Sequence, residues 1–203
     1  MQDLLLLGTG VHAGEMVEIV ARMNAVQPAW DLRGLIAAPE EAAEERANGA
    51  PVLPGRWEDY LGAAFVPAFG WPRELRPPRE RLVSLVDPSA FVSRTATIGV
   101  GCVIYPQCFV GLNARLGEVV FCLSGAVINQ DDVVEDGVTF ASGAMLAGNV
   151  HVEADCYLGQ GCLVRQFVRV GRGSMIGMGA VVVKEVAPGS VMVGNPARKL
   201  RRF

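Results

Sequence analysis

The sequence predicts a small α/β domain followed by a parallel β-helix. A six-residue period runs without insertion through residues 90 to 185, and two residues before each nonpolar site stands Ala, Cys, Val or Ser, with Asp132 as the exception. A fixed short period indicates a solenoid, in which each repeat buries its nonpolar side chain against its neighbours. Three repeats make an 18-residue triangular coil, so we expect a little over five coils. The sixteen nonpolar sites are Val92, Ile98, Ile104, Val110, Leu116, Cys122, Ile128, Val134, Phe140, Leu146, Val152, Leu158, Val164, Val170, Ile176 and Val182.

The first domain is expected from a strand, glycine turn and helix at the start of the chain. Residues 2 to 8 form an apolar run that ends at GTGVHAG, and EMVEIVARMN then keeps apolar positions at helical spacing. Gly8, Gly10 and Gly14 let backbone N–H groups approach an anionic ligand at a helix N-terminus. A phosphate or nucleotide cradle is therefore one reading of this turn.

The turn does not predict an NAD site. A dinucleotide fingerprint also needs an acidic residue at the end of the second strand. Here that strand, near Leu32 to Ile36, runs into Ala37, Ala38 and Pro39. A glycine fingerprint alone is a weak signal.

The rest of the first domain is read as short elements. We expect a short acidic helix at 40 to 47, a small strand at 52 to 54 and a fourth apolar strand at 64 to 68. Pro77 and Pro78 argue against a regular helix between 71 and 84. The predicted domains are an α/β domain at 1–85, the β-helix at 86–187 and a C-terminal extension at 188–203.

Composition excludes several classes of protein. The chain is 51% hydrophobic, with a formal net charge of -3, which gives no reason to expect nucleic acid. It contains no apolar run of about 18 residues, so a membrane span is not expected. MQDLLLLGTG lacks a basic region, so we do not expect a signal peptide.

The five cysteines are expected in the core and not at a metal or disulfide site. Cys122 occupies a nonpolar site of the repeat and the other four occupy its small sites, as is typical of buried free cysteine. Unpaired cysteines fit a reducing cytoplasm, where we place the protein. The other four are Cys102, Cys108, Cys156 and Cys162.

Glycine recurs every 18 residues, at Gly125, Gly143, Gly161 and Gly179, so the four fall on one corner of successive coils. One reading is a backbone conformation that glycine tolerates best. The other is an edge without side chains, open to an elongated ligand. The two readings are compatible. The chain ends in a basic tail, which is either solvated or a phosphate contact.

Together the repeat, the GNPAR ending and the GTGVHAG domain resemble the bacterial sugar acyltransferases that contain hexapeptide repeats. The most similar branch comprises sialic-acid O-acetyltransferases and nucleotide-4-amino-sugar N-acetyltransferases. The resemblance implies an α/β N-terminal Rossmann-like domain followed by an all-β left-handed parallel β-helix. It also implies a homotrimer with clefts between neighbouring β-helices, acetyl-CoA along the coils, and a nucleotide sugar held by the N-terminal domain. Outward Val103, Val127 and Val133 are expected to form a buried lateral face.

This chain departs from the catalytic pattern of the family at several positions. Where the family places its basic His, this chain reads Asn129-Gln130-Asp131, so the base is replaced by Gln130. Thr139 stands where a second His is common. An acidic pair is matched by Ala37-Ala38, and a Gly followed by Asp or Asn by Gly70-Trp71-Pro72. Gln cannot act as a general base, which typically contributes about 10² to 10⁴ in rate.

The site residues follow from this alignment. We hypothesise that Asp131, together with Gln130 and Asn129, forms the catalytic site. Buried Asp132, whose carboxyl would have a raised pKa, is either a second base or a hydrogen-bonded corner residue. His151 is expected to point outward in a surface role, unless a trimer brings it into the cleft of a neighbouring copy. Gly8, Gly10 and His12 are the substrate-binding hypothesis, and the acyl-CoA contacts are Thr139, Gly143, Gly161, Gly179, Asn195 and Arg198.

The function predicted is CoA-dependent acyl transfer to the amine of a nucleotide-linked amino sugar or similar small intermediate. An amine is favoured over an alcohol because a fraction of it arrives deprotonated. The alternatives are a trimeric binding or scaffold protein without catalysis, and a different reaction in the same cleft with Trp71 and His12 shaping the substrate.

Overall fold

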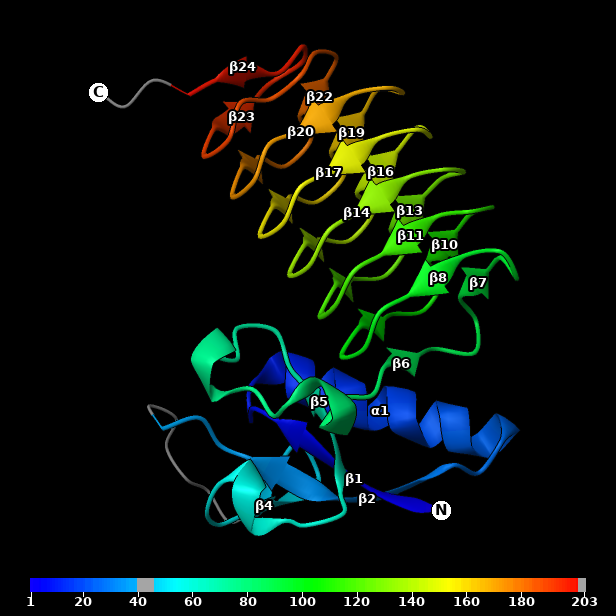
Figure 1. Cartoon of the computed structure of the whole chain (residues 1–203), viewed down its shortest axis with the longest axis vertical. Coiled ribbons are helices and arrows are strands. Elements are labelled where there is room, and N and C mark those ends of the chain that lie inside the picture. Colours follow the sequence, from blue (N-terminus) through cyan, green and yellow to red (C-terminus); the bar gives the residue numbers. More distant parts are fainter. Residues whose placement is uncertain (40–45, 201–203) are drawn as a thin grey trace. The chain divides into compact units, whose positions relative to one another are not determined.

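The computed structural model describes residues 1–39 and 46–200 (Figure 1). The chain divides into two units, Met1–Pro88 and Ser89–Phe203. The division lies three residues beyond the end expected for the first domain. A separate C-terminal extension remains a prediction. No helix among the described residues combines the length and apolar character needed to cross a membrane.

The first unit is a small sheet with one long helix. Leu4 to Leu7 of β1 are fully buried, and Ala13, Met16, Ile19 and Val20 give α1 its buried face at helical spacing. The sheet order is β3-β4-β2-β1-β5, with parallel pairing except between β3 and β4. The elements are β1 (Gln2–Leu7), α1 (Val11–Val26), β2 (Trp30–Ile36), β3 (Arg46–Ala47), β4 (Ala50–Leu53), β5 (Ala64–Pro67), β6 (Leu85–Val86) and the 3₁₀ turns η1 (Trp57–Asp59), η2 (Arg73–Leu75) and η3 (Arg79–Arg81).

Two expectations for this unit need correction. The helix begins at Val11, immediately after Gly10, so His12 and Gly14 lie in its first turn and not in the preceding loop. The acidic helix predicted at 40 to 47 falls mostly outside the described residues. Its last two residues are strand β3, because Asn48 and Gly49 form a two-residue hairpin turn with positive φ at both. The absence of a regular helix between 71 and 84 is confirmed.

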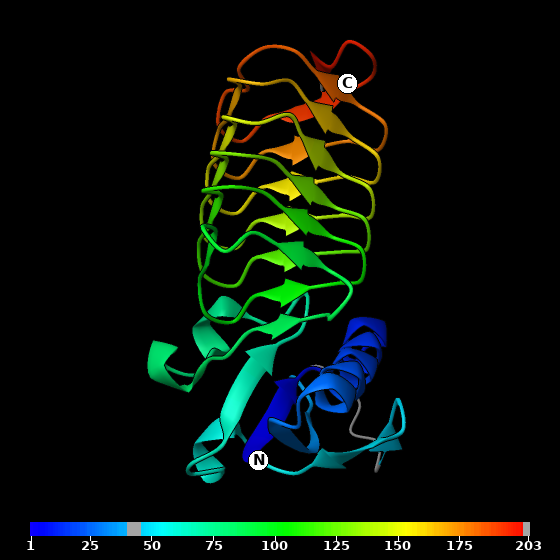
Figure 2. The ribbon, with the colours of Figure 1, turned by 90° about the vertical axis from the view of Figure 1, so that its right-hand side faces the viewer.

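The second unit is a parallel β-helix, which Figure 2 shows as a regular stack of coils. Sixteen two-residue strands, three to a coil, give five coils and one further strand, and each pairs in parallel with the strand 18 residues away. The inward residues coincide with the nonpolar sites read from the sequence, and Ile104, Ile128 and Phe140 are fully buried. All five cysteines are buried and free, which confirms their place in the core.

The outward residues give each face a character of its own. The apolar face has strands β7 (Phe91–Val92), β10 (Phe109–Val110), β13 (Val127–Ile128), β16 (Met145–Leu146), β19 (Leu163–Val164) and β22 (Val181–Val182). The charged face has β8 (Thr97–Ile98), β11 (Arg115–Leu116), β14 (Val133–Val134), β17 (His151–Val152) and β20 (Arg169–Val170). The third face has β9 (Val103–Ile104), β12 (Phe121–Cys122), β15 (Thr139–Phe140), β18 (Tyr157–Leu158), β21 (Met175–Ile176), β23 (Val191–Val193) and β24 (Arg198–Lys199).

The lateral face expected from Val103, Val127 and Val133 is corrected in part. Val103 is fully buried within the chain itself, so it offers no surface to a partner. Val127 and Val133 are half-buried and belong to different faces. The continuous outward apolar row is instead Phe91, Phe109, Val127, Met145, Leu163 and Val181, of which Val127 and Val181 are half-buried and the other four are exposed.

Candidate active site

Every corner of the β-helix from residue 101 to 179 turns through one left-handed residue. Fourteen consecutive positions, six residues apart, have φ between +53° and +73°. They lie on three edges. The acid edge, between the apolar and charged faces, carries Asn113, Asp131, Asn149 and Phe167. The glycine edge, between the third and apolar faces, carries Gln107, Gly125, Gly143, Gly161 and Gly179. The remaining edge carries Gly101, Val119, Gly137, Asp155 and Gly173.

The acid edge presents the predicted catalytic residues. Asp131 is exposed, and its Oδ1 accepts a hydrogen bond of 3.0 Å from Nδ2 of Asn113, one coil earlier. Asp and Asn tolerate the left-handed conformation of this corner. The side chain of Gln130 lies against Gly148, where an added Cβ would collide with its amide. Asp131 and Gln130 are therefore both accessible at one turn.

The hydrogen bonds of Asn129 indicate a structural role. Its Nδ2 donates to the carbonyl oxygen of Leu146 at 2.7 Å, and its backbone N–H donates to Asp132 Oδ2 at 2.7 Å. These bonds tie the corner to the following coil. They use the side-chain and backbone N–H donors of Asn129 with which a bound substrate would otherwise form hydrogen bonds.

Asp132 is fully buried, and both of its carboxylate oxygens accept backbone N–H groups. Oδ1 accepts from Val150 at 2.8 Å, in addition to the bond between Oδ2 and Asn129. Burial raises the pKa of Asp132 from 3.8 to about 6, although these two hydrogen bonds lower it, and the charge of Asp131 raises it further. Asp132 is thus arranged as a hydrogen-bonded corner residue, one of the two roles expected for it.

The glycine edge is accessible along its length, and packing does not explain its composition. A Cβ on Gly161 or Gly179 would meet nothing within 4 Å, and one on Gly143 would make only ordinary contact at 3.9 Å. The left-handed backbone is not a sufficient reason either, because Gln107 adopts it on the same edge and Asn and Asp do so on the acid edge. From Gly125 to Gly179, the left-handed position of this edge therefore carries no side chain.

The other predicted acyl-CoA contacts lie at different places. The register of β21 with β23 is shifted by sixteen residues, so Asn195 follows Gly179 on the glycine edge. Arg198 is exposed in β24, with Nη1 donating to its neighbour Ala197 at 3.0 Å. Thr139 is only 9% exposed in β15 of the third face. The structure therefore brings Asn195 into line with the glycines, but not Thr139.

The glycine turn of the first unit borders a cavity of about 240 Å³ at the carboxyl ends of β1 and β5. Gly8 has φ +119°, and a Cβ there would approach that of Ala68 to 3.1 Å. His12 bonds Glu15 through Nδ1 at 3.1 Å and meets Phe69 edge-to-face, with ring centroids 5.4 Å apart. Gly8, Gly10 and His12 thus line one cavity. The other residues around it are Leu7, Val11, Ala13, Ala38, Ala68, Phe69, Gly70 and Trp71.

Sequence reasoning missed Asn48 as a support for this turn. Its Nδ2 donates to the carbonyl oxygens of Thr9 and Gly10, at 3.0 and 3.1 Å. The signal was the Asn-Gly pair, which is typical of a hairpin turn and not of the end of a helix.

A second cavity of about 290 Å³ adjoins Trp71 and was also missed. Ala37 lines it, together with Arg56 and the half-buried Trp57, whose ring meets Phe65 edge-on at 6.3 Å. Ala37 and Ala38 therefore face two different cavities, and neither supplies a polar side chain. The remaining lining residues are Ile36, Pro39, Gly55 and Leu75.

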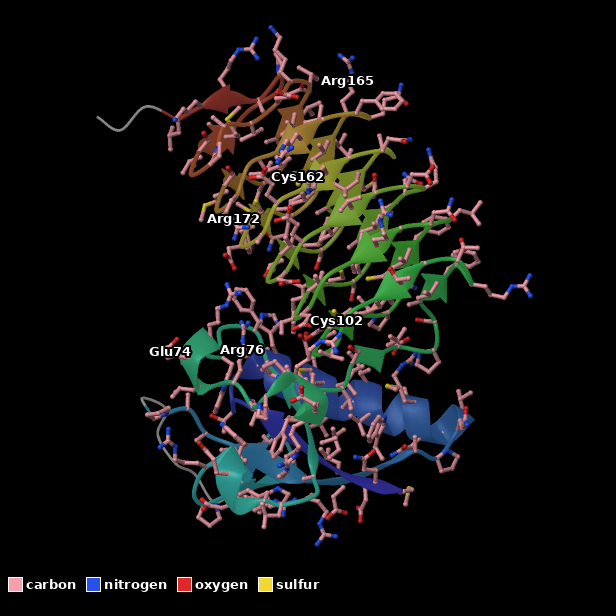
Figure 3. The ribbon with its side chains drawn as sticks, in the orientation of Figure 1. Glu74, Arg76, Cys102, Cys162, Arg165 and Arg172 are labelled. Atoms are coloured by element: carbon pink, nitrogen blue, oxygen red, sulfur yellow. The ribbon has the colours of Figure 1, made fainter. Side chains whose placement is uncertain are left out.

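His151 lies on the charged face, as an outward surface residue. Its Nε2 bonds Glu135 Oε1 at 2.8 Å, and Glu135 Oε2 accepts the N–H of Ala154 at 3.0 Å. Burial raises the pKa of Glu135, but these hydrogen bonds and the charge of Arg172 outweigh it, so the pKa lies below its usual value. The exposed Arg172, labelled in Figure 3, completes an ion-pair network. No group of His, Cys, Asp or Glu within 1–39 and 46–200 is arranged to hold a metal ion.

Comparison with known proteins identifies relatives, although no family model matches. GDP-perosamine N-acetyltransferase of Escherichia coli O157:H7 is 34% identical over 125 residues, which cover 59% of this chain and 57% of that enzyme. The chain thus spans less than two thirds of this relative.

Solved structures match the chain more fully. The acetyltransferase domain of PglB from Neisseria gonorrhoeae FA1090, in complex with acetyl coenzyme A, is 26% identical with a TM-score of 0.85, covering 98% of this chain and 99% of that one. A variant of GDP-perosamine N-acetyl transferase from Caulobacter crescentus, in complex with CoA and GDP-perosamine, has 22% identity and a TM-score of 0.85, covering 100% and 98%, and supports the fold alone. These matches confirm the resemblance drawn from the repeat.

Proposed function

We infer that this chain, as a hexapeptide-repeat acyltransferase, transfers an acetyl group from acetyl-CoA to the amine of a nucleotide-linked amino sugar or a similar small biosynthetic intermediate. The observation that carries the inference is the glycine edge. Four accessible glycines and Asn195 form a straight path along the coils, where neither packing nor backbone conformation calls for glycine at every site. An extended thioester ligand fits such a path.

The chemistry is assigned to the acid edge. The acceptor nitrogen attacks the thioester carbonyl, a C–N bond forms, the C–S bond breaks and CoA leaves as the thiolate. The proton lost by nitrogen passes to the Asp131 carboxylate and then to the departing sulfur. Asn113 orients Asp131, whose Oδ2 has no partner among the described residues. Placing the amine beside a thioester contributes about 7 to 11 kcal/mol. Gln130 contributes hydrogen bonds and no proton transfer.

Binding of the co-substrate is assigned to Gly143, Gly161 and Gly179, with Asn195 continuing their edge. Arg198, exposed beyond that edge, is the proposed contact for the phosphates of CoA. Thr139 is kept as a proposed contact of acyl-CoA. Because its side chain is buried, it can contact the ligand only through strand β15, which leads to Gly143.

Binding of the acceptor is assigned to the cavity lined by Gly8, Gly10 and His12. The cavity lies at the carboxyl ends of parallel strands, where α/β domains commonly bind ligands, and the N-terminal end of α1 favours an anion. We read this unit as Rossmann-like on the basis of its β1-α1-β2 crossover and parallel order.

We further propose a homotrimer of left-handed β-helices in the cytoplasm. The glycine edge and the acid edge lie on opposite sides of the apolar face, so one chain does not bring them together. Covering that face with a second copy, which would bury its outward apolar row, would place the glycine edge of one copy near the acid edge of another. Five reduced, buried cysteines support a cytoplasmic location.

A second candidate is a trimeric binding protein without catalysis. It is favoured by Gln130, which has no titratable group, and by the burial of Thr139. Calorimetric titration with acetyl-CoA followed by turnover across acyl-CoAs and amino sugars separates the two. Saturable product formation supports the transferase. Binding without turnover supports the second candidate, and absence of binding at millimolar acetyl-CoA contradicts the transferase.

A further inference from the structure

Phe167 occupies a corner of the acid edge in a conformation that suits it poorly. Its φ is +61°, and it is 69% exposed. Asn113, Asp131 and Asn149 fill the same corner in the preceding coils, and their short polar side chains tolerate left-handed backbone. A bulky side chain there is strained, and strain that survives away from the core points to a functional role.

Burial within the chain does not compensate for this strain. The ring stands largely in solvent, and an exposed side chain gains little from packing. The exposed Arg165 precedes it, projecting from the same turn (Figure 3). The fold would accept Asn at this site as readily as it does one coil earlier.

The position of Phe167 indicates what it meets. It lies two coils beyond Asp131 on the same edge, which is about 10 Å at the usual spacing of neighbouring strands. Asn195 and Arg198 lie further along, at the end of the β-helix. Along the axis of the β-helix, Phe167 therefore lies between the corner assigned to the chemistry and Arg198, the residue assigned to the phosphates.

We propose that Phe167 is a binding residue for acyl-CoA, and that its ring contacts the pantetheine arm from the copy facing the glycine edge. This inference rests on the proposed function and the cleft between two copies. The arm has an apolar body with amides, and an aromatic ring offers it a large surface at little cost in conformational entropy.

The test is Phe167→Asn, which reproduces the residue one coil earlier. KM for acetyl-CoA should rise about tenfold while kcat stays unchanged, as expected for loss of an aromatic binding contact. The melting temperature should stay the same or rise, because strain is relieved. Phe167→Gly, free in this backbone region, should behave in the same way. Val119→Asn relieves a similar strain on the remaining edge and should leave KM unchanged.

A truncated donor locates the contact. The KM of S-acetyl-N-acetylcysteamine, which lacks most of the arm, should be unaffected by Phe167→Asn. An equal rise for both donors, or an unchanged KM for acetyl-CoA, would overturn the proposal. So would a change in molecular mass without a change in KM, since the ring would then serve only to join copies. If the wild-type chain neither binds nor uses acetyl-CoA, the proposed function fails together with this inference. If the wild-type enzyme turns over and the variant matches it, only this inference fails.

Discussion

Asp132 sets a carboxylate inside the β-helix, at a site where the other coils hold a small nonpolar residue or Ser174. Its two hydrogen bonds join the corner of Asn129 to the coil of Val150. Burial removes this carboxylate from water, which raises the free energy of its charged form. This is the reason for its raised pKa, and it makes the stability of the chain depend on pH.

The sign of that dependence follows from the two pKa values. The folded state holds the proton up to about pH 6 and the unfolded state only to about 3.8, so the folded state binds more protons between them. The contribution of Asp132 to the free energy of unfolding therefore falls as pH rises through this window, by up to about 3 kcal/mol, and is constant above it. Asp132→Ala removes this contribution. Its stability relative to wild type should rise between pH 4 and 6 in urea unfolding, and parallel curves would contradict the assignment.

Asp131 is the residue on which the proposed proton transfer depends. Asp131→Asn preserves the hydrogen-bonding shape of the corner and should lower kcat by about 10² to 10⁴, with the pH-rate profile altered. Asp155→Asn is the matched control, because Asp155 has the same backbone conformation on the remaining edge. An unchanged profile in Asp131→Asn would remove this carboxylate from the mechanism.

Among the elements, the glycine edge offers a direct test of ligand binding. Gly161→Asn adds a side chain where the backbone has φ +63° and space is open. Because Asn tolerates this conformation, the cost in stability should be below about 1 kcal/mol.

KM for acetyl-CoA should nevertheless rise at least about tenfold, because the new side chain would occupy the proposed path of the ligand. Gly173→Asn is the control, with φ +64° and equally open space on the remaining edge. Steady-state kinetics on both variants, with melting temperatures, distinguish a blocked site from a weakened fold. Equal KM values in both would argue against binding along the glycine edge.

The regular elements could be predicted from the sequence because periodicity reports burial directly. The sixteen inward sites and the first strand follow from it. The sequence places the start of α1 too far along the chain, because no polar N-cap residue precedes Val11, where the helix begins. The hairpin at Asn48 was missed because acidic residues before it favoured a helix.

The site could be predicted less well, because it depends on surface geometry. The repeat predicts which residues point inward, but the left-handed backbone at Gln107, Val119 and Phe167 has no signal in residue type. Asp132 was visible as an anomaly, but only the structure shows that both its oxygens are employed. The cavity beside Trp57 joins residues from several segments and leaves no local pattern.

For the whole molecule, the outward apolar row predicts association. Leu163 and Met145 are 43% and 41% exposed in its centre. Leu163→Asp should convert the proposed trimer to a monomer, because a charge facing a nonpolar interface lacks solvation. Light scattering measures the mass, and transfer activity should disappear with the trimer. Met175→Asp, at a residue 49% exposed on the third face, should retain the wild-type mass. A Leu163→Asp protein that keeps its mass would place the interface elsewhere.

The uninterrupted series of corners also sets the unit in which this β-helix can change length. Removing six residues would preserve the inward pattern but turn every later residue onto the next edge, so that the glycines beyond the deletion would leave their line. Removing eighteen restores every column and shortens the path by one coil. Length variation that keeps the proposed site should therefore occur in multiples of eighteen residues, which a deletion series in the coils can test by folding and turnover together.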